Sequence, residues 1–246
     1  MNKIIKLKEL SKKCGSNSFF TLNIIDEKLP IILISPGGAY EHISTRENKP
    51  VSDKFLKLGY NTCVLSYSVY PESYPFPLID IEETFKYLKN RFNKVFVMGF
   101  SAGAHLTALL GTSKLSKEIS AMVLCYPVIS MTKYFHKGSR DNFLGSNNND
   151  KLAHELSIEN RVNKETPPTF IWTTKEDQAV PYENTLMLID ALKNNNIPHE
   201  YKIFPHGRHG LALADETAIK NNDLSFFNEE VQIWPTLVDN FLKKYK

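Results

Sequence analysis

The stretch KVFVMGFSAGAHLTALLG, residues 94–111, changes its character at a single serine. The residues before Ser101 are almost all apolar, as in a buried strand, and the apolar residues after it recur at helical spacing. Gly99 and Gly103 stand two residues to either side. A G-x-S-x-G pattern between a strand and a helix predicts a tight turn that lifts the serine hydroxyl clear of the backbone. We predict that Ser101 is a nucleophile, the alternative being a structural glycine-rich turn.

Strand-like and helix-like segments alternate along the chain, and this alternation predicts the fold class. We expect strands at 19–25, 30–36, 61–69, 94–100, 119–128, 169–174 and 199–204. We expect helices at 50–58, from Leu78, from Ala102, at 181–194 and around 233–242. The proline-rich YPESYPFP that precedes Leu78 is expected to be irregular, because proline removes backbone donors. The order implies an α/β fold with a mostly parallel sheet, helices on both faces, and chemistry at the carboxyl ends of the strands.

The length and the absence of internal repeats favour one domain. A chain of 246 residues can form one large α/β domain or two small ones, and no low-complexity linker divides this sequence. We therefore expect a single domain over residues 1–246. Residues 129–165 are polar, rich in asparagine and without a clear period. We interpret them as a lid or cap insertion.

Charge and cysteine content bound the class of protein. The 30 basic and 27 acidic residues give a formal charge of +3, and neither sign is concentrated, which excludes nucleic acid and membrane partners. The three cysteines lack a metal-ligand spacing and are expected to be buried reduced thiols. No metal and no nucleotide cofactor is indicated. Because no apolar run has signal-peptide or transmembrane character, we expect a soluble cytoplasmic protein and leave a homodimer open.

A serine nucleophile needs a base that is held by an acid, and both are expected after the serine along the chain. Asp177 follows the predicted strand 169–174 directly, and Glu176 is its nearest rival. The helix expected from Pro181 favours Asp177 as the side chain that faces inward. Two later carboxylates fit less well, because Asp190 falls within that helix and Asp215 comes after the histidine loop.

The base is expected in FPHGRHGLALAD, which follows the predicted strand 199–204. We favour His209 over His206, because Gly210 gives the chain freedom to present the neighbouring imidazole to a cleft. His105 lies one turn after the serine on its helix, and we interpret it as a structural histidine.

Backbone amides are expected to stabilise the oxyanion. One is Ala102, directly after the nucleophile, and the other comes from SPGGAYEH, residues 35–42, which follows the apolar run 30–34. Gly38 is the main candidate there, with Ala39 or Gly37 assisting. Pocket walls are expected from aromatic residues that could equally belong to the core: Tyr40, Tyr67, Tyr70, Tyr134 and Phe135.

Together these residues resemble the α/β-hydrolase esterases, and within them the acetyl esterase and xylan-deacetylase-like group related to hormone-sensitive lipase. The similarity covers nearly the whole chain from about residue 30. PGGAY resembles the oxyanion segment, where Pro36 and Ala39 replace the outer residues of the common His-Gly-Gly-Gly run. GFSAGAHL resembles the nucleophile turn, PPTFIWTTKEDQAVPYENTLMLIDAL the acid-bearing strand and its helix, and FPHGRHGLALAD the histidine loop.

The resemblance implies an α/β-hydrolase fold and hydrolysis of short-chain esters, often acetyl groups on sugars. We therefore expect a serine carboxylesterase that acts on a small-molecule ester through Ser101, His209 and Asp177, with an acyl-enzyme intermediate. An arylformamidase or a small amide or peptide hydrolase would use the same residues. A receptor of this fold without catalysis is the remaining alternative.

Overall fold

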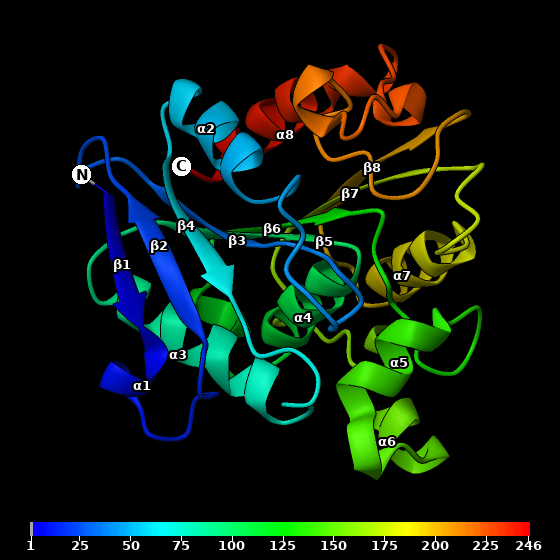
Figure 1. Ribbon diagram of the computed structural model, residues 1–246, viewed down its shortest axis with the longest axis horizontal. Helices are drawn as coiled ribbons and strands as arrows, with labels where there is room; N and C mark the ends of the chain where they lie inside the picture. The colour runs from blue at the N-terminus through cyan, green and yellow to red at the C-terminus, as the bar shows by residue number, and fades with distance from the viewer. Residues whose placement is uncertain (1) are drawn as a thin grey trace.

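A computed structural model describes residues 2–246 and shows one central sheet of eight strands (Figure 1). Its order is β1-β2-β4-β3-β5-β6-β7-β8. The strands are β1 (Asn2–Lys6), β2 (Phe19–Asn23), β3 (Ile31–Ser35), β4 (Asn61–Ser66), β5 (Val95–Phe100), β6 (Ala121–Cys125), β7 (Thr169–Thr174) and β8 (His199–Phe204). The pairs β1/β2 and β2/β4 are antiparallel and the other pairs are parallel. The predicted mostly parallel sheet is confirmed.

Helices cover both faces of this sheet (Figure 1). One face packs against α2 (Lys49–Lys57) and α8 (Trp234–Leu242), and the other against α3 (Phe76–Lys89), α4 (Ala102–Gly111) and α7 (Glu183–Asn194). The short helices are α1 (Leu7–Leu10), α5 (Lys137–Leu144) and α6 (Asp150–Glu155). Across residues 2–246, none of the helices has the length and apolar character that a membrane crossing requires.

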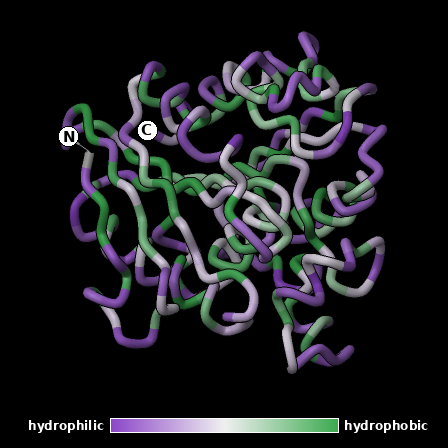
Figure 2. Tube along the Cα trace, in the orientation of Figure 1, coloured by the Kyte–Doolittle hydropathy of each residue, from purple (hydrophilic) through white to green (hydrophobic). Residues whose placement is uncertain are grey.

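The central strands are apolar along their whole length because both of their faces are buried. In β3, Ile31 and Leu33 pack with the α3, α4 and α7 layer, whereas Ile32 and Ile34 pack with the α2 and α8 layer. Figure 2 shows this apolar interior along the central strands and hydrophilic loops around it. Burying both faces is what makes these strands recognisable in the sequence as unbroken apolar runs.

The order of the strands places a switch point between β3 and β5. The chain leaves β3 to form β4 on one side, and then crosses to form β5 on the other side. The register pairs Ser35 with Gly99, so the loop after β3 and the turn after β5 begin side by side. Sheets of this kind hold their sites at such a crevice, outside the carboxyl ends of the strands.

Two elements near the beginning of the chain differ from the sequence expectation. Strand β1 is absent from the expected strands, because its apolar run is only two residues long and lies between lysines, and the structure adds it at the sheet edge, where Ile4 is exposed. Helix α3 begins at Phe76 rather than at Leu78, so Phe76 and Pro77 belong to its first turn. Proline is tolerated there because the first amides of a helix have no acceptor within it.

Residues 129–165 form the two short helices α5 and α6 and two short 3₁₀ turns. Helices of 8 and 6 residues are too short to show a clear helical period in the sequence. The segment is attached to the loop after β3. Asn142 Nδ2 donates to the carbonyl of Ala39 at 3.0 Å, and the ring centroids of Phe143 and Tyr40 lie 4.5 Å apart.

Candidate active site

Ser101 occupies a strained turn between β5 and α4. Its backbone has φ 52° and ψ −119°, a conformation that costs an L-residue energy and that the surrounding structure must enforce. The Ser101 amide donates to the carbonyl of Cys125 at 3.0 Å, which ties the turn to β6. A Cβ at Gly99 would overlap the carbonyl of Gly103, so the close passage of strand and helix requires these glycines.

Three side chains from three loops meet at this turn. Ser101 Oγ lies 2.7 Å from His209 Nε2, and His209 Nδ1 lies 2.6 Å from Asp177 Oδ2. Because a carboxylate can only accept, His209 Nδ1 carries the proton that it donates to Asp177, and Nε2 is left to accept the Ser101 hydroxyl. The Asp177 side chain is fully buried and that of His209 is 21% exposed. The imidazole therefore reaches the surface of the pocket while the carboxylate is shielded from water.

The loop after β7 fixes the Asp177 carboxylate and turns its neighbour away. Asp177 Oδ1 accepts the amides of Ala179 at 2.9 Å and Val180 at 2.8 Å. The rival carboxylate, Glu176, lies on the surface and pairs with the rival imidazole, His206, at 2.9 Å. The two neighbouring acids thus contact two different histidines, and only Asp177 contacts the one beside Ser101.

The loop after β3 carries the expected oxyanion donors. Gly38 and Ala39 both have positive φ, 121° and 55°, so this backbone is turned sharply beside the serine. The Gly37 amide donates to Glu47 Oε2 at 2.7 Å. This corrects the expectation that Gly37 could assist as a donor, because its hydrogen already has an acceptor. Gly38 and Ala39 remain as candidates on this side, opposite Ala102 at the start of α4.

A buried carboxylate supports the site and was missed by sequence reasoning. Glu47 is only 3% exposed, and its Oε1 accepts the Tyr126 hydroxyl at 2.6 Å. The same hydroxyl accepts the Ala212 amide at 3.1 Å, and the Tyr126 ring packs edge-on against His209. Glu47 therefore connects the loop after β3 to the loop that carries the histidine. Nothing in the sequence distinguishes it from the exposed Glu41 nearby.

Tyr40 and Tyr67 lie beneath the loop after β3 instead of lining the pocket. The Tyr67 hydroxyl donates to the carbonyl of Pro36 at 2.7 Å, and the Tyr40 hydroxyl contacts His105 Nδ1 at 2.8 Å. Both rings are buried. The expectation that they bind substrate is therefore corrected, since their surfaces and hydroxyls are used inside the protein.

His105 is a structural histidine, as predicted. Its Nε2 lies 2.8 Å from the carbonyl of Leu156, which can only accept, so Nδ1 is the atom that accepts the Tyr40 hydroxyl. Burial lowers the pKa of His105 to about 4, with a smaller contribution from the nearby charge of Arg161 and against the hydrogen bond to the Leu156 carbonyl, which raises it. The imidazole is neutral at pH 7 and satisfied at both nitrogens.

Ser101 and His209 open into a pocket of about 260 Å³. Its wall includes residues that the sequence did not single out: His42, Ser44, Arg46, His136, Arg208 and Phe226. Burial lowers the pKa of His136, so this wall histidine is neutral at pH 7. Tyr134 and Phe135, which were considered as wall residues, are partly exposed and do not belong to this lining.

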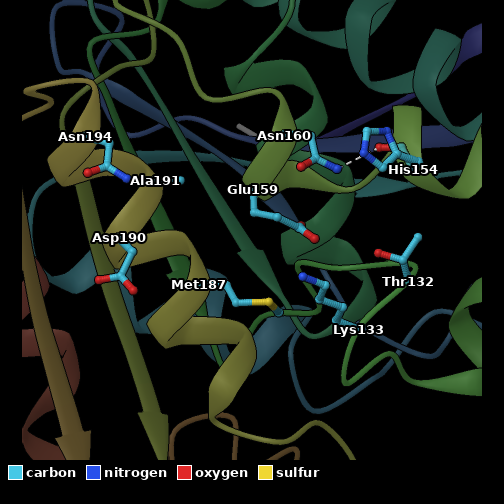
Figure 3. A pocket seen from close by; sticks show the side chains of 9 residues that line it. All are labelled: Thr132, Lys133, His154, Glu159, Asn160, Met187, Asp190, Ala191 and Asn194. Carbon is cyan, nitrogen blue, oxygen red and sulfur yellow. Dashed lines mark hydrogen bonds between the residues drawn. The ribbon is translucent and has the colours of Figure 1, made fainter.

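A second hollow of about 340 Å³ lies between α7 and residues 129–165 (Figure 3). Glu159 and Lys133 face it from the segment 129–165, and Asp190 faces it from α7. Neither Ser101 nor His209 lines this hollow. The candidate nucleophile and base therefore belong to the smaller pocket.

Comparison with known proteins gives one family and several relatives. The profile of the BD-FAE family matches residues 21–192. The chain is 33% identical over 223 residues to endo-1,4-beta-xylanase B of Butyrivibrio fibrisolvens, covering 81% of this chain and 35% of that protein. It is 33% identical over 222 residues to acetylxylan esterase of Xylanibacter ruminicola, covering 79% of this chain and 46% of that protein. The chain thus spans about a third to a half of these curated relatives.

A solved structure matches nearly end to end. The acetyl ester-xyloside bifunctional hydrolase of Caldicellulosiruptor lactoaceticus has a TM-score of 0.87 and 33% sequence identity. The match covers 98% of this chain and 96% of that one. The similarity therefore includes the whole sheet and the loops at its carboxyl edge.

Proposed function

This chain belongs to the BD-FAE family of α/β hydrolases, and we propose that it is a serine carboxylesterase that removes short acyl groups, acetyl above all, from esterified sugars. The membership agrees with the resemblance inferred from the sequence. The substrate class is supported by the relatives that are named for acetylxylan and acetyl ester-xyloside hydrolysis.

The observation that carries the proposal is the continuous hydrogen-bonded chain Ser101–His209–Asp177. In the proposed mechanism His209 Nε2 takes the hydroxyl proton as Ser101 Oγ attacks the acyl carbonyl. Asp177 holds the imidazole in the tautomer that allows this and stabilises the imidazolium that forms. The imidazolium then gives its proton to the departing alcohol, and water releases the acyl group by the same route.

The negative charge of the tetrahedral intermediate is assigned to backbone amides. We propose that Gly38 or Ala39 donates from one side and Ala102 from the other. Ala102 begins α4, whose first amides have no acceptor within the helix and carry the positive end of its dipole. Losing one such donor typically costs roughly 10²–10³ in kcat.

Two further features support a small acyl group and one compact catalytic unit. The pocket beside Ser101 has only about 260 Å³, at the low end of ligand sites, and its rim is rich in charged and polar side chains. All eight strands share one sheet. We therefore propose a single domain, with residues 129–165 as a lid or cap whose contact with Ala39 keeps it beside the site.

A covalent probe tests whether the chain is a serine hydrolase. A fluorophosphonate should label the wild type and should not label Ser101→Ala, whose kcat should fall on the order of 10⁶. Ser44→Ala is the matched control, because Ser44 lines the same pocket without contacting His209. Labelling of Ser101→Ala would refute Ser101 as the nucleophile, whereas no labelling of either protein would favour a receptor without catalysis.

A substrate panel tests the ester. Nitrophenyl esters with two to eight acyl carbons, acetylated xylo-oligosaccharides and an aryl formamide should be compared by kcat/KM. We expect the acetyl esters to be hydrolysed fastest. A preference for the formamide would replace the substrate while leaving the nucleophile unchanged.

A further inference from the structure

Two arginines and one phenylalanine form a stack at the wall of the catalytic pocket. The Cζ atoms of Arg46 and Arg208 lie 3.8 Å and 4.0 Å from the ring centroid of Phe226. Two guanidinium groups this close to the same ring centroid would collide on one face of the ring, so the Phe226 ring lies between them. All three residues line the pocket that contains Ser101. Cation–π contacts of this kind hold a planar guanidinium in a fixed orientation.

The two arginines differ in how their hydrogen-bond donors are used. Arg208 donates to Ser225 Oγ at 2.7 Å and to Asp223 Oδ2 at 3.3 Å. Arg46 forms no ion pair in the described part of the chain, and its buried Nε has no acceptor there. The charge of Arg46 acts on Asp223, but this carboxylate is engaged by Ser225 and Arg208, and the adjacent Glu47 is engaged by Gly37 and Tyr126. Arg46 is therefore a fixed cation with unused donors at the pocket.

Arg46 lies on the side of the pocket where the alcohol part of the ester is expected. Its Nη2 lies 3.6 Å from where a Cβ on Gly210 would be, so the guanidinium sits beside the residue that follows His209. In ester hydrolysis by the proposed mechanism, the histidine gives its proton to the departing alcohol. The alcohol part of the substrate must therefore lie on the His209 side, within reach of Arg46.

We propose that Arg46, held by Phe226, binds a carboxylate on the alcohol part of the ester, so that the enzyme prefers acidic substrates. The inference rests on the proposed esterase function. A guanidinium presents paired N–H donors in the geometry that a carboxylate accepts. The fitting substrates are acyl esters of sugar acids, or of oligosaccharides that contain a uronic acid, and of aromatic hydroxy acids.

Matched model esters test the inference. 4-Acetoxybenzoate and its neutral methyl ester release the same acetyl group from the same ring position and differ in the carboxylate. Arg46→Gln should lower kcat/KM for 4-acetoxybenzoate at least tenfold, mainly through KM, and should leave the methyl ester within about twofold. Arg46→Lys, which keeps the charge without the planar fork, should fall between. Raising the salt concentration should increase KM for the acid ester alone.

One control checks that the effect is specific to this arginine, and a second checks which side of the ester carries the recognised carboxylate. Arg140→Gln is the matched variant, because Arg140 also lies over a phenylalanine, Phe135, but pairs with Asp150 outside this pocket. It should leave both esters unchanged. The mono(4-nitrophenyl) ester of succinic acid carries a carboxylate on its acyl group and 4-nitrophenyl acetate does not, so this pair tests recognition on the acyl side. An equal loss on charged and neutral esters, no loss on 4-acetoxybenzoate, or a loss confined to the succinate ester would each overturn the proposal.

A binding measurement keeps this inference distinguishable from the proposed function. 4-Hydroxybenzoate, the acidic product, should bind to Ser101→Ala protein, and adding Arg46→Gln should weaken its Kd at least tenfold. If the wild type hydrolyses none of the neutral esters, the esterase proposal fails, whereas retained Arg46-dependent binding would still support the anion site. Phe226→Leu keeps an apolar side chain and removes the ring, and it should weaken binding in the same direction. Unchanged binding in both variants would refute the site.

Discussion

The Tyr126 hydroxyl lies 2.6 Å from the Glu47 carboxylate and connects the loop after β3 with the loop that carries His209. One oxygen of Glu47 holds the Gly37 amide, beside the expected oxyanion donors, and the Tyr126 hydroxyl holds the Ala212 amide, three residues after His209. The pair thus fixes the position of the loop after β3 relative to the imidazole of His209.

Removing either the Glu47 carboxylate or the Tyr126 hydroxyl should lower kcat more than it changes KM. Glu47→Gln and Tyr126→Phe should each reduce kcat about tenfold or more, because a displacement of about 1 Å in a catalytic group can cost on the order of 100-fold. The double variant should lose little more than either single one. Steady-state kinetics with active-site titration measures this. The matched control is Tyr60→Phe, which breaks a buried tyrosine–carboxylate pair with Asp239 away from the pocket and should leave kcat unchanged. Equal effects of Tyr60→Phe and Tyr126→Phe would contradict the positioning role.

Two neighbouring carboxylates should differ sharply in their effect on rate. Asp177→Asn should lower kcat by about 10⁴, because an amide in place of the carboxylate favours the wrong imidazole tautomer. Glu176→Gln should leave kcat within about twofold, since Glu176 pairs with His206 at the surface. Parallel kcat measurements on the two variants check this. A large loss in Glu176→Gln would show that the surface pair takes part in catalysis.

The turn at Ser101 should not tolerate an added methyl group. A Cβ at Gly103 would overlap the carbonyl oxygens of Ser35 and Pro36. Gly103→Ala should therefore lower the free energy of unfolding by about 3 kcal/mol, the upper range for overpacking, and should reduce activity as well. In Gly59→Ala the added Cβ has no atom within 4 Å, and the φ of 85° alone should cost about 1–2 kcal/mol. Urea unfolding of both variants measures the difference, and equal losses would contradict the close passage of β3 and α4.

The free energy of unfolding should decrease as the pH is lowered, because the buried His105 resists protonation in the folded protein. Burial holds the folded-state pKa of His105 at about 4, below the ordinary value of 6.5, so the folded protein binds fewer protons than the unfolded chain between these values. The contribution is fully present above pH 6.5 and is lost as the pH falls toward 4. Between pH 7 and pH 5, His105 should lower the free energy of unfolding by about 2 kcal/mol. His105→Gln should flatten the dependence by that amount in urea unfolding at both pH values.

The matched variant for this pH test is His206→Gln. Glu176 raises the pKa of the exposed His206, so any contribution of His206 has the opposite sign and is lost as the pH rises. This variant should not flatten the fall in stability below pH 6.5. If His206→Gln flattened it as much as His105→Gln, the buried imidazole would not be its source.

The convergence of Ser101, Asp177 and His209 at the carboxyl edge of the sheet could be predicted from the sequence because each of them follows a strand. Ser101, Asp177 and His209 stand after β5, β7 and β8, and parallel strands end at one edge, so local strand patterns were enough to bring them together. His105 could likewise be interpreted as structural from its position one turn after Ser101 on the same helix, and the structure buries it there.

The supporting residues could not be predicted in this way. Glu47 and Tyr126 are 79 positions apart, and neither lies where a periodic pattern points to a partner. Arg46 and Phe226 belong to irregular loops, where the backbone path follows tertiary contacts and not the residue order. Tyr40 and Tyr67 were misassigned to the pocket because an aromatic residue after a strand looks the same in sequence whether its ring faces a cleft or the core.

The bond from Asn142 to the Ala39 carbonyl bears on how this scaffold could be redesigned. Exchanging residues 129–165 for a longer cap would be the obvious route to larger acyl groups. Such a graft would also remove the amide of Asn142 and the ring of Phe143, which contact the turn that carries the proposed oxyanion donors. If residues 129–165 act as the proposed cap, replacing them would also loosen the turn that carries the proposed oxyanion donors, so a transplanted segment would need equivalent contacts with that turn.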